Sequence, residues 1–332
     1  MKTKAAAVQG GLAALGLIAA YTTWQREPDR PAGEVVVMDV GKNDLQKVRF
    51  DDGTKWVELT ETKESGEPVV YMKLAANAQT KTPERELRGN DGAVKLWDKF
   101  TPLRGSRALG NLAADKLKEL GLDAAKKHIE VTVRGEKRVL DVGASPFGVS
   151  DPYVKTSDGK VYVLGGSVVS DLESAAVRLV ERALHGFKPQ EWDALVVSAG
   201  GKKRELQQIN PEQPMAAKLA SKKTPTKPDE MAKNWHDKLW RSFAAELLGR
   251  GEQPAAGAPQ IALRVDYSSG GKPKGWIEIG RVTPQPAAPL NTSAPPPAAE
   301  LYARTEHTAG WVKLPPAAED LLKEAEKLAA AE

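Results

Sequence analysis

Cysteine is absent from this chain of 332 residues, and histidine is scarce. Without cysteine there are no disulfide bonds, thiolate metal sites, cysteine nucleophile or lipid anchor on cysteine. No two of the four histidines have the HxxxH spacing of a metal site; they are His128, His185, His236 and His307. The chain also has no GxSxG elbow, no GxxxxGK[ST] loop and no GxGxxG motif. We therefore expect neither an enzyme nor a cofactor.

A strong excess of one charge is also missing, because 48 basic residues face 44 acidic ones and leave a formal charge of +4. Nucleic-acid binding needs a concentrated basic face, so we expect no nucleic-acid partner. The chain is 41% hydrophobic and 28% charged, which is enough to bury an ordinary core. Its length favours about two domains.

The N-terminus has the pattern of a membrane anchor. Lys2 and Lys4 precede an apolar run over 5–24, whose length at 1.5 Å per residue matches a bilayer core of about 30 Å. Tyr21 and Trp24 stand where an interfacial aromatic belt would lie. The lysines keep the N-terminus in the cytoplasm, so this pattern predicts an inner-membrane protein with a single transmembrane helix at 1–24 and a stalk at 25–34. The rest of the chain would then be periplasmic.

Two other interpretations of this segment remain open. A cleaved signal peptide would need a small-x-small site, and the best candidate, Ile18-Ala19-Ala20, has a large first residue. A soluble N-terminal helix would need a polar face, which the run lacks. We therefore favour the uncleaved anchor.

Alternating apolar residues and turn signals predict antiparallel hairpins in both halves of the chain. The predicted strands are 34–39, 45–50, 55–60, 68–74, 128–133, 137–142, 153–154, 161–163, 192–198, 203–208, 261–267, 275–281, 301–304 and 310–314. Helical spacing predicts helices at 91–100, 106–120, 167–184, 229–248 and 317–331, with Gly121 and Gly249 as helix ends. We expect loops at 75–88 and 210–228.

The order hairpin, helix, four strands and helix occurs twice. The segment 129–142 corresponds to 261–279, and Val161–Leu164 corresponds to Trp311–Leu314. We therefore predict an α+β protein made of two duplicated repeats with largely antiparallel sheets. The first repeat spans 35–187, and the second spans 188–332 with a proline-rich insertion at 283–299.

Several segments resemble a bacterial family known as domain of unknown function 4340. They are ELGLDAAKKHIEVTV, VGASPFGVSDPYVK, VYVLGGSVVSDL and RLVERALHGF, and the resemblance covers about Val35 to Leu314. The family implies a membrane-anchored envelope protein, often encoded beside ABC transporters of the gliding-motility class. It carries no catalytic residues over to this chain.

A basic region spans 202–227, from the predicted hairpin 192–208 into the predicted loop 210–228. If the chain is anchored, this region is a candidate contact for anionic lipid headgroups or for an acidic protein partner. A solvated loop is the plainer explanation. The residues are Lys202, Lys203, Arg204, Lys218, Lys222, Lys223 and Lys227.

Other polar residues have simpler explanations than catalysis. Asp51, Asp52 and Asp158 lie in predicted hairpin turns, where aspartate is a common turn former. His236 follows Trp235 on a predicted helix, and we interpret it as a surface or core-edge residue. Most of the eight tryptophans should be core residues.

Three functions follow, in order of preference. The first is a non-enzymatic, membrane-anchored periplasmic scaffold or accessory subunit that works with an ABC-type transporter. The second is a periplasmic binding module that holds a glycan or another envelope ligand in a cleft between the repeats. The third is an envelope hydrolase with an unrecognised site.

Overall fold

The protein is built mainly from antiparallel β-sheet, with 19% of residues in helices and 43% in strands. The computed structural model describes residues 34–64, 66–77, 82–148, 151–213, 217–283 and 298–331. Every strand pairing between these residues is antiparallel. The predicted α+β class with largely antiparallel sheets is therefore confirmed.

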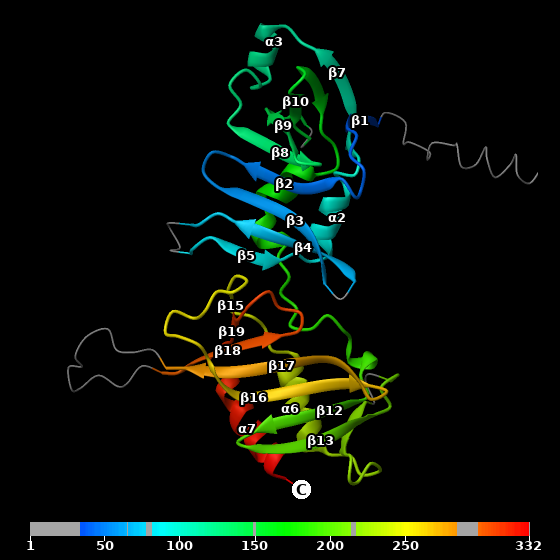
Figure 1. Cartoon of the computed structure of the whole chain (residues 1–332), viewed down its shortest axis with the longest axis vertical. Coiled ribbons are helices and arrows are strands. Elements are labelled where there is room, and N and C mark those ends of the chain that lie inside the picture. Colours follow the sequence, from blue (N-terminus) through cyan, green and yellow to red (C-terminus); the bar gives the residue numbers. More distant parts are fainter. Residues whose placement is uncertain are drawn as a thin grey trace, which may run out of the picture.

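The N-terminal half, residues 34–180, contains a nine-stranded sheet in the order β5-β4-β3-β2-β8-β9-β10-β11-β7 and a small sheet of β1 and β6 (Figure 1). Its strands are β1 Val35–Met38, β2 Leu45–Asp51, β3 Trp56–Glu64, β4 Glu67–Leu74, β5 Arg85–Arg88, β6 Leu103–Gly105, β7 Arg107–Asn111, β8 Lys127–Val133, β9 Glu136–Val142, β10 Tyr153–Thr156 and β11 Lys160–Val163. Its helices are α2 Asp91–Asp98, α3 Ala114–Glu119, α4 Val168–Glu173 and α5 Ala175–Arg178.

The C-terminal half, residues 192–331, contains an eight-stranded sheet in the order β14-β13-β12-β16-β17-β18-β19-β15. Its strands are β12 Ala194–Ala199, β13 Lys202–Ile209, β14 Lys218–Ser221, β15 Glu246–Leu247, β16 Gln260–Ser269, β17 Lys272–Val282, β18 Glu300–Thr305 and β19 Val312–Lys313. Its helices are α6 Glu230–Trp240 and α7 Ala318–Ala330, and a short 3-10 turn, Pro189–Glu191, ends the linker 181–191 between the halves.

The two sheets share one strand order. The first sheet is compared from β4 to β7 and the second from β14 to β15. Strands that come in the same order along the chain then occupy the same positions across the two sheets. Strand β5 is an additional strand at the edge of the first sheet. In both halves a helix, α2 or α6, separates the first three strands of the shared order from a short strand, β7 or β15, that pairs with the last strand of the meander. In the first half β5 precedes α2 and β6 follows it as additional strands. The chain therefore builds the same arrangement twice.

Each half has its own core on one face of its sheet. Inward residues alternate with outward ones along the strands, as in β12, where Leu195, Val197 and Ala199 are buried. In the C-terminal half α7 lies against β12 and β13 and packs beside α6. The core of the first half ends at Val180, and that of the second begins at Leu184. The opposite face of each sheet is largely polar.

Glycines allow the tightest hairpin turns that the sequence predicts. Gly200 and Gly201 between β12 and β13 have φ angles of +56° and +75°. Residues with a Cβ rarely adopt this left-handed region, whereas glycine enters it at little cost. The predicted hairpin at 192–208 is thereby confirmed. The pairing of β12 with β13 runs from Ala194 opposite Gln207 to Ala199 opposite Lys202.

Three of the five helix predictions are wrong in extent. The predicted helix 106–120 is strand β7 followed by the short α3, which buries no side chain. The predicted helix 229–248 stops at Trp240, so Gly249 is not a helix end, whereas Gly121 with φ +68° does follow α3. The predicted helix 167–184 breaks at Ser174 into α4 and α5. In each case pairing with a distant strand or a tertiary contact overrides helical spacing.

Two segments expected to be loops contain edge strands. The segment 75–88 holds β5, which pairs with β4, and the segment 210–228 holds β14, which pairs with β13. Both strands have only four residues, so their sequences show little periodicity.

Within the part of the chain that the structure describes, no helix has both the length and the apolar character required to span a bilayer. The predicted anchor 1–24, most of the stalk 25–34 and most of the proline-rich insertion 283–299 lie outside the described residues.

Candidate functional site

The two halves meet at a hydrogen-bonded junction between their sheets. The segment 245–250, which includes β15, binds β19 on one side: Ala245 N donates to Lys313 O at 2.8 Å and Leu248 N donates to Trp311 O at 2.9 Å. On the other side Arg250 N donates to Glu86 O of β5 at 2.8 Å. The edge of the first sheet is therefore connected through this segment to the edge of the second.

Arg85 of β5 fastens this junction. Its guanidinium contacts the Glu252 carboxylate at 2.8 and 2.9 Å, Glu246 Oε1 at 3.0 Å and Leu247 O at 2.8 Å. The Arg85 side chain is only 12% exposed, and these hydrogen bonds raise its pKa against the effect of burial. Burying a paired charge costs less free energy than burying an unpaired one. Arg85 therefore forms specific charged hydrogen bonds that connect the two halves.

The backbones approach closely at the junction. A Cβ on Gly249 would lie 3.2 Å from Glu86 N and 3.3 Å from Arg85 Cα. A Cβ on Gly310 would collide with Gly249 O. A side chain on Gly249 would therefore crowd the backbone of β5 across the junction, and Gly310 is required by close packing within the C-terminal half.

A second set of contacts fixes the linker 181–191. Glu181 faces His307 Nε2 at 3.4 Å, His185 Nδ1 lies 3.3 Å from Glu306 Oε1, and Thr305 Oγ1 donates to Leu184 O. The hydrogen bond from His307 lowers the pKa of Glu181 to about 2. The linker is thus held against the loop after β18.

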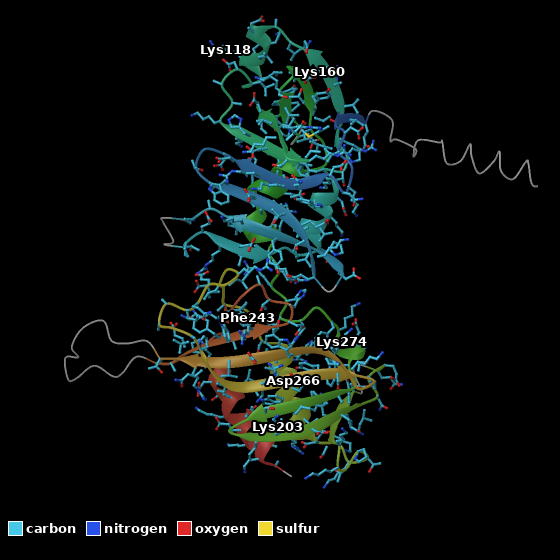
Figure 2. All side chains as sticks on the ribbon, in the orientation of Figure 1. Lys118, Lys160, Lys203, Phe243, Asp266 and Lys274 are labelled. Carbon is cyan, nitrogen blue, oxygen red and sulfur yellow. The ribbon has the colours of Figure 1, made fainter. Side chains whose placement is uncertain are left out.

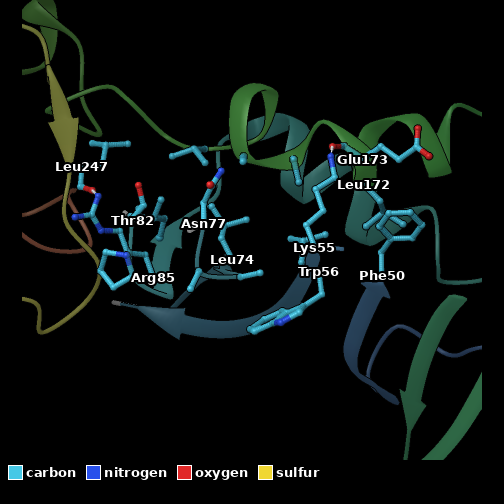
Figure 3. A pocket seen from close by; sticks show the side chains of 18 of the residues that line it. Phe50, Lys55, Trp56, Leu74, Asn77, Thr82, Arg85, Leu172, Glu173 and Leu247 are labelled. Atoms are coloured by element: carbon cyan, nitrogen blue, oxygen red, sulfur yellow. Dashed lines mark hydrogen bonds between the residues drawn. The ribbon is translucent and has the colours of Figure 1, made fainter. Parts of the chain in front are cut away.

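An open pocket of about 680 Å³ lies beside the junction. Its walls come from the adjoining ends of β3 and β4, from β5, from α4 and α5, and from β15. Figure 3 shows Lys55 and Arg85 toward opposite ends of the pocket, with Leu74 and Asn77 between them. Trp56 points away from the helical wall, and its ring instead carries the Arg49 guanidinium at 4.1 Å.

The basic region predicted to contact a partner or lipid is divided by acidic neighbours. Arg204 is 10% exposed and donates to Asp229 at 2.6 Å, so it is part of the fold. Lys222 pairs with Glu205 at 2.8 Å, and Lys218 lies 3.9 Å from Glu230.

Four members of the region remain exposed and, among the described residues, form no ion pair: Lys202, Lys203, Lys223 and Lys227. They stand on and after β13 and β14, at the outer edge of the second sheet. Figure 1 shows β13 at the far end of the molecule from β1, and Figure 2 labels Lys203 there and Lys118 at the opposite end. The four lysines therefore lie far from the point where the N-terminal segment joins the fold.

His236 is buried, so its interpretation as a surface or core-edge residue is wrong. It is 6% exposed, its Nε2 lies 3.2 Å from the Tyr267 hydroxyl, and burial lowers its pKa to about 4. His185 stacks on Trp240 nearby, with ring centroids 4.7 Å apart. This cluster fills the core with aromatic rings.

The described residues contain no group of three or more His, Asp or Glu side chains placed to hold a metal ion. His128 faces Asp141 at 3.0 Å on the outer face of the first sheet. The turn aspartates have the local roles that we expected. Asp51 accepts from Gly53 N and Asp52 from Thr54 N, both at 2.9 Å, and Lys160 holds the pKa of Asp158 down at about 2.

Sequence reasoning missed Arg85 and the pocket. The run Arg85-Glu86-Leu87-Arg88 has one apolar residue among three charged ones and shows no strand alternation over its four positions. Its partners Glu246 and Glu252 are more than 160 residues away. No local pattern connects residues so distant in the chain.

Comparison with protein-family models, with characterised proteins and with solved structures finds no match. The resemblance to the domain of unknown function 4340 family stays a prediction from the sequence motifs.

Proposed function

We propose that the chain is a non-enzymatic scaffold or accessory subunit. In this proposal it is anchored in the cytoplasmic membrane by residues 1–24, extends into the periplasm and works with an ABC-type transporter. The observation that carries the proposal is the junction of the halves, where Arg85 and the segment 245–250 fasten two sheets into one elongated body. A body of this kind can hold two distant surfaces at a fixed separation.

The shared strand order of the sheets supports the finer proposal that the halves arose by duplication. Separate expression of residues 181–332, which keeps Leu184 and Phe187 of the second core, tests whether the second half is a folding unit. We expect a cooperative unfolding transition, and a chain without one would contradict two independent repeats.

The exposed lysines of β13 and the turn after β14 are the proposed partner surface. Their distance from β1, the first described strand, favours a protein partner over the lipid headgroups of the membrane that would hold the anchor (Figure 1). An acidic protein surface complements unpaired lysines and would accelerate association.

Photo-cross-linking in native membranes tests this proposal. A cross-linking amino acid at Lys203 or Lys223 should capture a protein partner, identified by mass spectrometry as a transporter subunit. The matched control is the same amino acid at Lys95, which is exposed on α2 of the other half. Capture only of lipid, or recovery of a monomer with no membrane partner, would contradict the proposal.

The pocket beside the junction supports a second candidate, a binding module for a glycan or another envelope ligand. Its volume of about 680 Å³ falls in the range of about 300–1,000 Å³ that small-molecule sites occupy. Ligand-dependent thermal stabilisation of the full chain tests this candidate, because a ligand that binds only the folded state raises its stability.

A further inference from the structure

The pocket beside the junction has an apolar wall among polar side chains. Apolar side chains reach it from the sheet, from α4, from the segment after α5 and from β15; they include Phe50, Leu74, Leu87, Leu172, Val180 and Leu247. Several of these side chains also belong to the hydrophobic core of the N-terminal half. A ligand here would bury apolar surface, which favours binding by roughly 25 cal/mol per Å² removed from water.

The charges around the pocket leave it positive. The Glu173 carboxylate is bound by Lys127 Nζ at 2.6 Å, and Glu246 is bound by Arg85 at 3.0 Å. Lys55 Nζ donates to the Glu173 carbonyl oxygen at 2.9 Å, and Arg182 is exposed at the rim. Among the described residues neither of these two cations forms an ion pair with a carboxylate.

We infer that this pocket binds an anionic amphiphile, a molecule with one apolar chain and one carboxylate or phosphate head. The chain would lie against the apolar wall, and the head would meet Arg182, which is exposed at the rim. A charged head paired with such a cation forms stronger hydrogen bonds than a neutral one. The inference rests on the second candidate function and names its ligand class.

A glycan fits the same pocket less well. Sugar rings commonly stack on a free aromatic face, and the only tryptophan among the lining residues that the structure describes, Trp56, carries Arg49 on its ring and points away from the helical wall (Figure 3). The lining also carries hydrogen-bonding side chains, among them Thr54, Asn77 and Thr82, so the missing tryptophan face is what disfavours a glycan. The composition of the walls therefore separates the two ligand classes.

Titration calorimetry on the full chain with dodecanoate as the probe tests the inference. We expect one dodecanoate per chain, at least tenfold weaker binding of dodecyltrimethylammonium, which has the same tail and the opposite charge, and no binding of acetate. Equal binding of the two amphiphiles, or no binding of dodecanoate, would overturn the inference.

Two pairs of variants locate the probe. Ala176→Trp fills the pocket from an exposed position on α5 and should abolish binding, whereas Val177→Trp, exposed on the same helix but absent from the pocket walls, should leave it unchanged. Arg182→Gln should weaken dodecanoate about tenfold, and Lys203→Gln should not. If Ala176→Trp binds dodecanoate as wild type does, the site is elsewhere and the inference fails.

Competition distinguishes the sources of such a ligand and separates the inference from the function on which it rests. If phosphatidylglycerol vesicles displace dodecanoate and phosphatidylcholine vesicles do not, the natural ligand of the site is a membrane lipid. If neither kind of vesicle displaces dodecanoate, the natural ligand is a free amphiphile. Maltohexaose that binds wild type but not Ala176→Trp, while dodecanoate binds neither, would overturn the ligand class and leave the binding-module function standing.

Discussion

At the scale of single residues, ionisable groups in this protein serve mainly to fix structure. Arg85, Arg204 and His236 are all largely buried, and each has a specific polar partner. Burial of such groups without partners would cost several kcal/mol, so each partner is needed for its residue to be tolerated.

His236 makes a prediction about pH. Its pKa is about 4 in the folded protein and 6.5 ordinarily, because burial disfavours the charged ring. As pH falls from 7 to 5 the unfolded chain gains a proton that the folded chain refuses, so stability falls, by about 2 kcal/mol. His236→Gln keeps an amide for the Tyr267 hydroxyl and removes the titration.

Urea denaturation of both proteins at pH 7 and pH 5 measures this effect, since the other titrating groups are common to both. We expect wild type to lose about 2 kcal/mol more than His236→Gln between the two pH values. Parallel losses would show that His236 does not remain neutral in the folded state.

Residue types alone did not reveal which polar side chains are buried. His236 sits on a helix whose pattern placed Trp235 and Leu239 inward, and one more position on that face was enough to bury it. The turn aspartates were predictable, because an Asx turn is made within a few residues. Local chemistry can be inferred from the sequence, and burial set by distant elements cannot.

At the scale of elements, the sequence predicted the hairpins better than the helices. Long strands with alternating apolar residues and glycine turns, such as β16 and β17, are local structures and were found. The short strands β7 and β15 were placed inside helices, because their residues also fit a helical stripe. Each is held by a strand about 50 or more residues away, β11 or β19, which no local pattern records.

Helix α2 begins at a cap that also ties it to α5. Asn90 Oδ1 accepts from Gly92 N at 2.8 Å, and its Nδ2 donates to Arg178 O at 2.9 Å. Asn90→Ala removes both contacts and should lower the free energy of unfolding by about 1–2 kcal/mol. Asn90→Ser keeps the capping hydrogen bond and loses the hydrogen bond to Arg178 O, so it should lower the free energy of unfolding by about half as much. Equal losses in the two variants, measured by urea denaturation, would show that the cap contributes nothing.

At the scale of the whole molecule, two sheets with one strand order are joined edge to edge. Two backbone hydrogen bonds cover the outer edge of β5. Arg250 N donates to Glu86 O and Glu181 N donates to Arg88 O, both at 2.8 Å. Covering an edge strand protects it from pairing with another chain. The junction therefore both connects the halves and closes an exposed edge.

Arg85 should carry more of the junction's stability than its neighbour Arg250. Arg85→Ala leaves the Glu252 carboxylate without its cationic partner and should cost on the order of 2–3 kcal/mol. Arg250 is 51% exposed and lies 3.9 and 4.0 Å from its carboxylates, so Arg250→Ala should cost less than about 1 kcal/mol. Denaturation curves measure both losses. A larger loss for Arg250→Ala would show that the fastening lies elsewhere.

The most direct test of a single body made of two fastened halves is the distance distribution between them. Because the chain has no cysteine, Lys95→Cys on α2 and Met231→Cys on α6 place two spin labels selectively at exposed positions. Pulsed electron paramagnetic resonance should give one narrow distance distribution, which broadens when Arg85→Ala is added. A broad distribution with Arg85 in place would contradict the account, because the halves would then move independently.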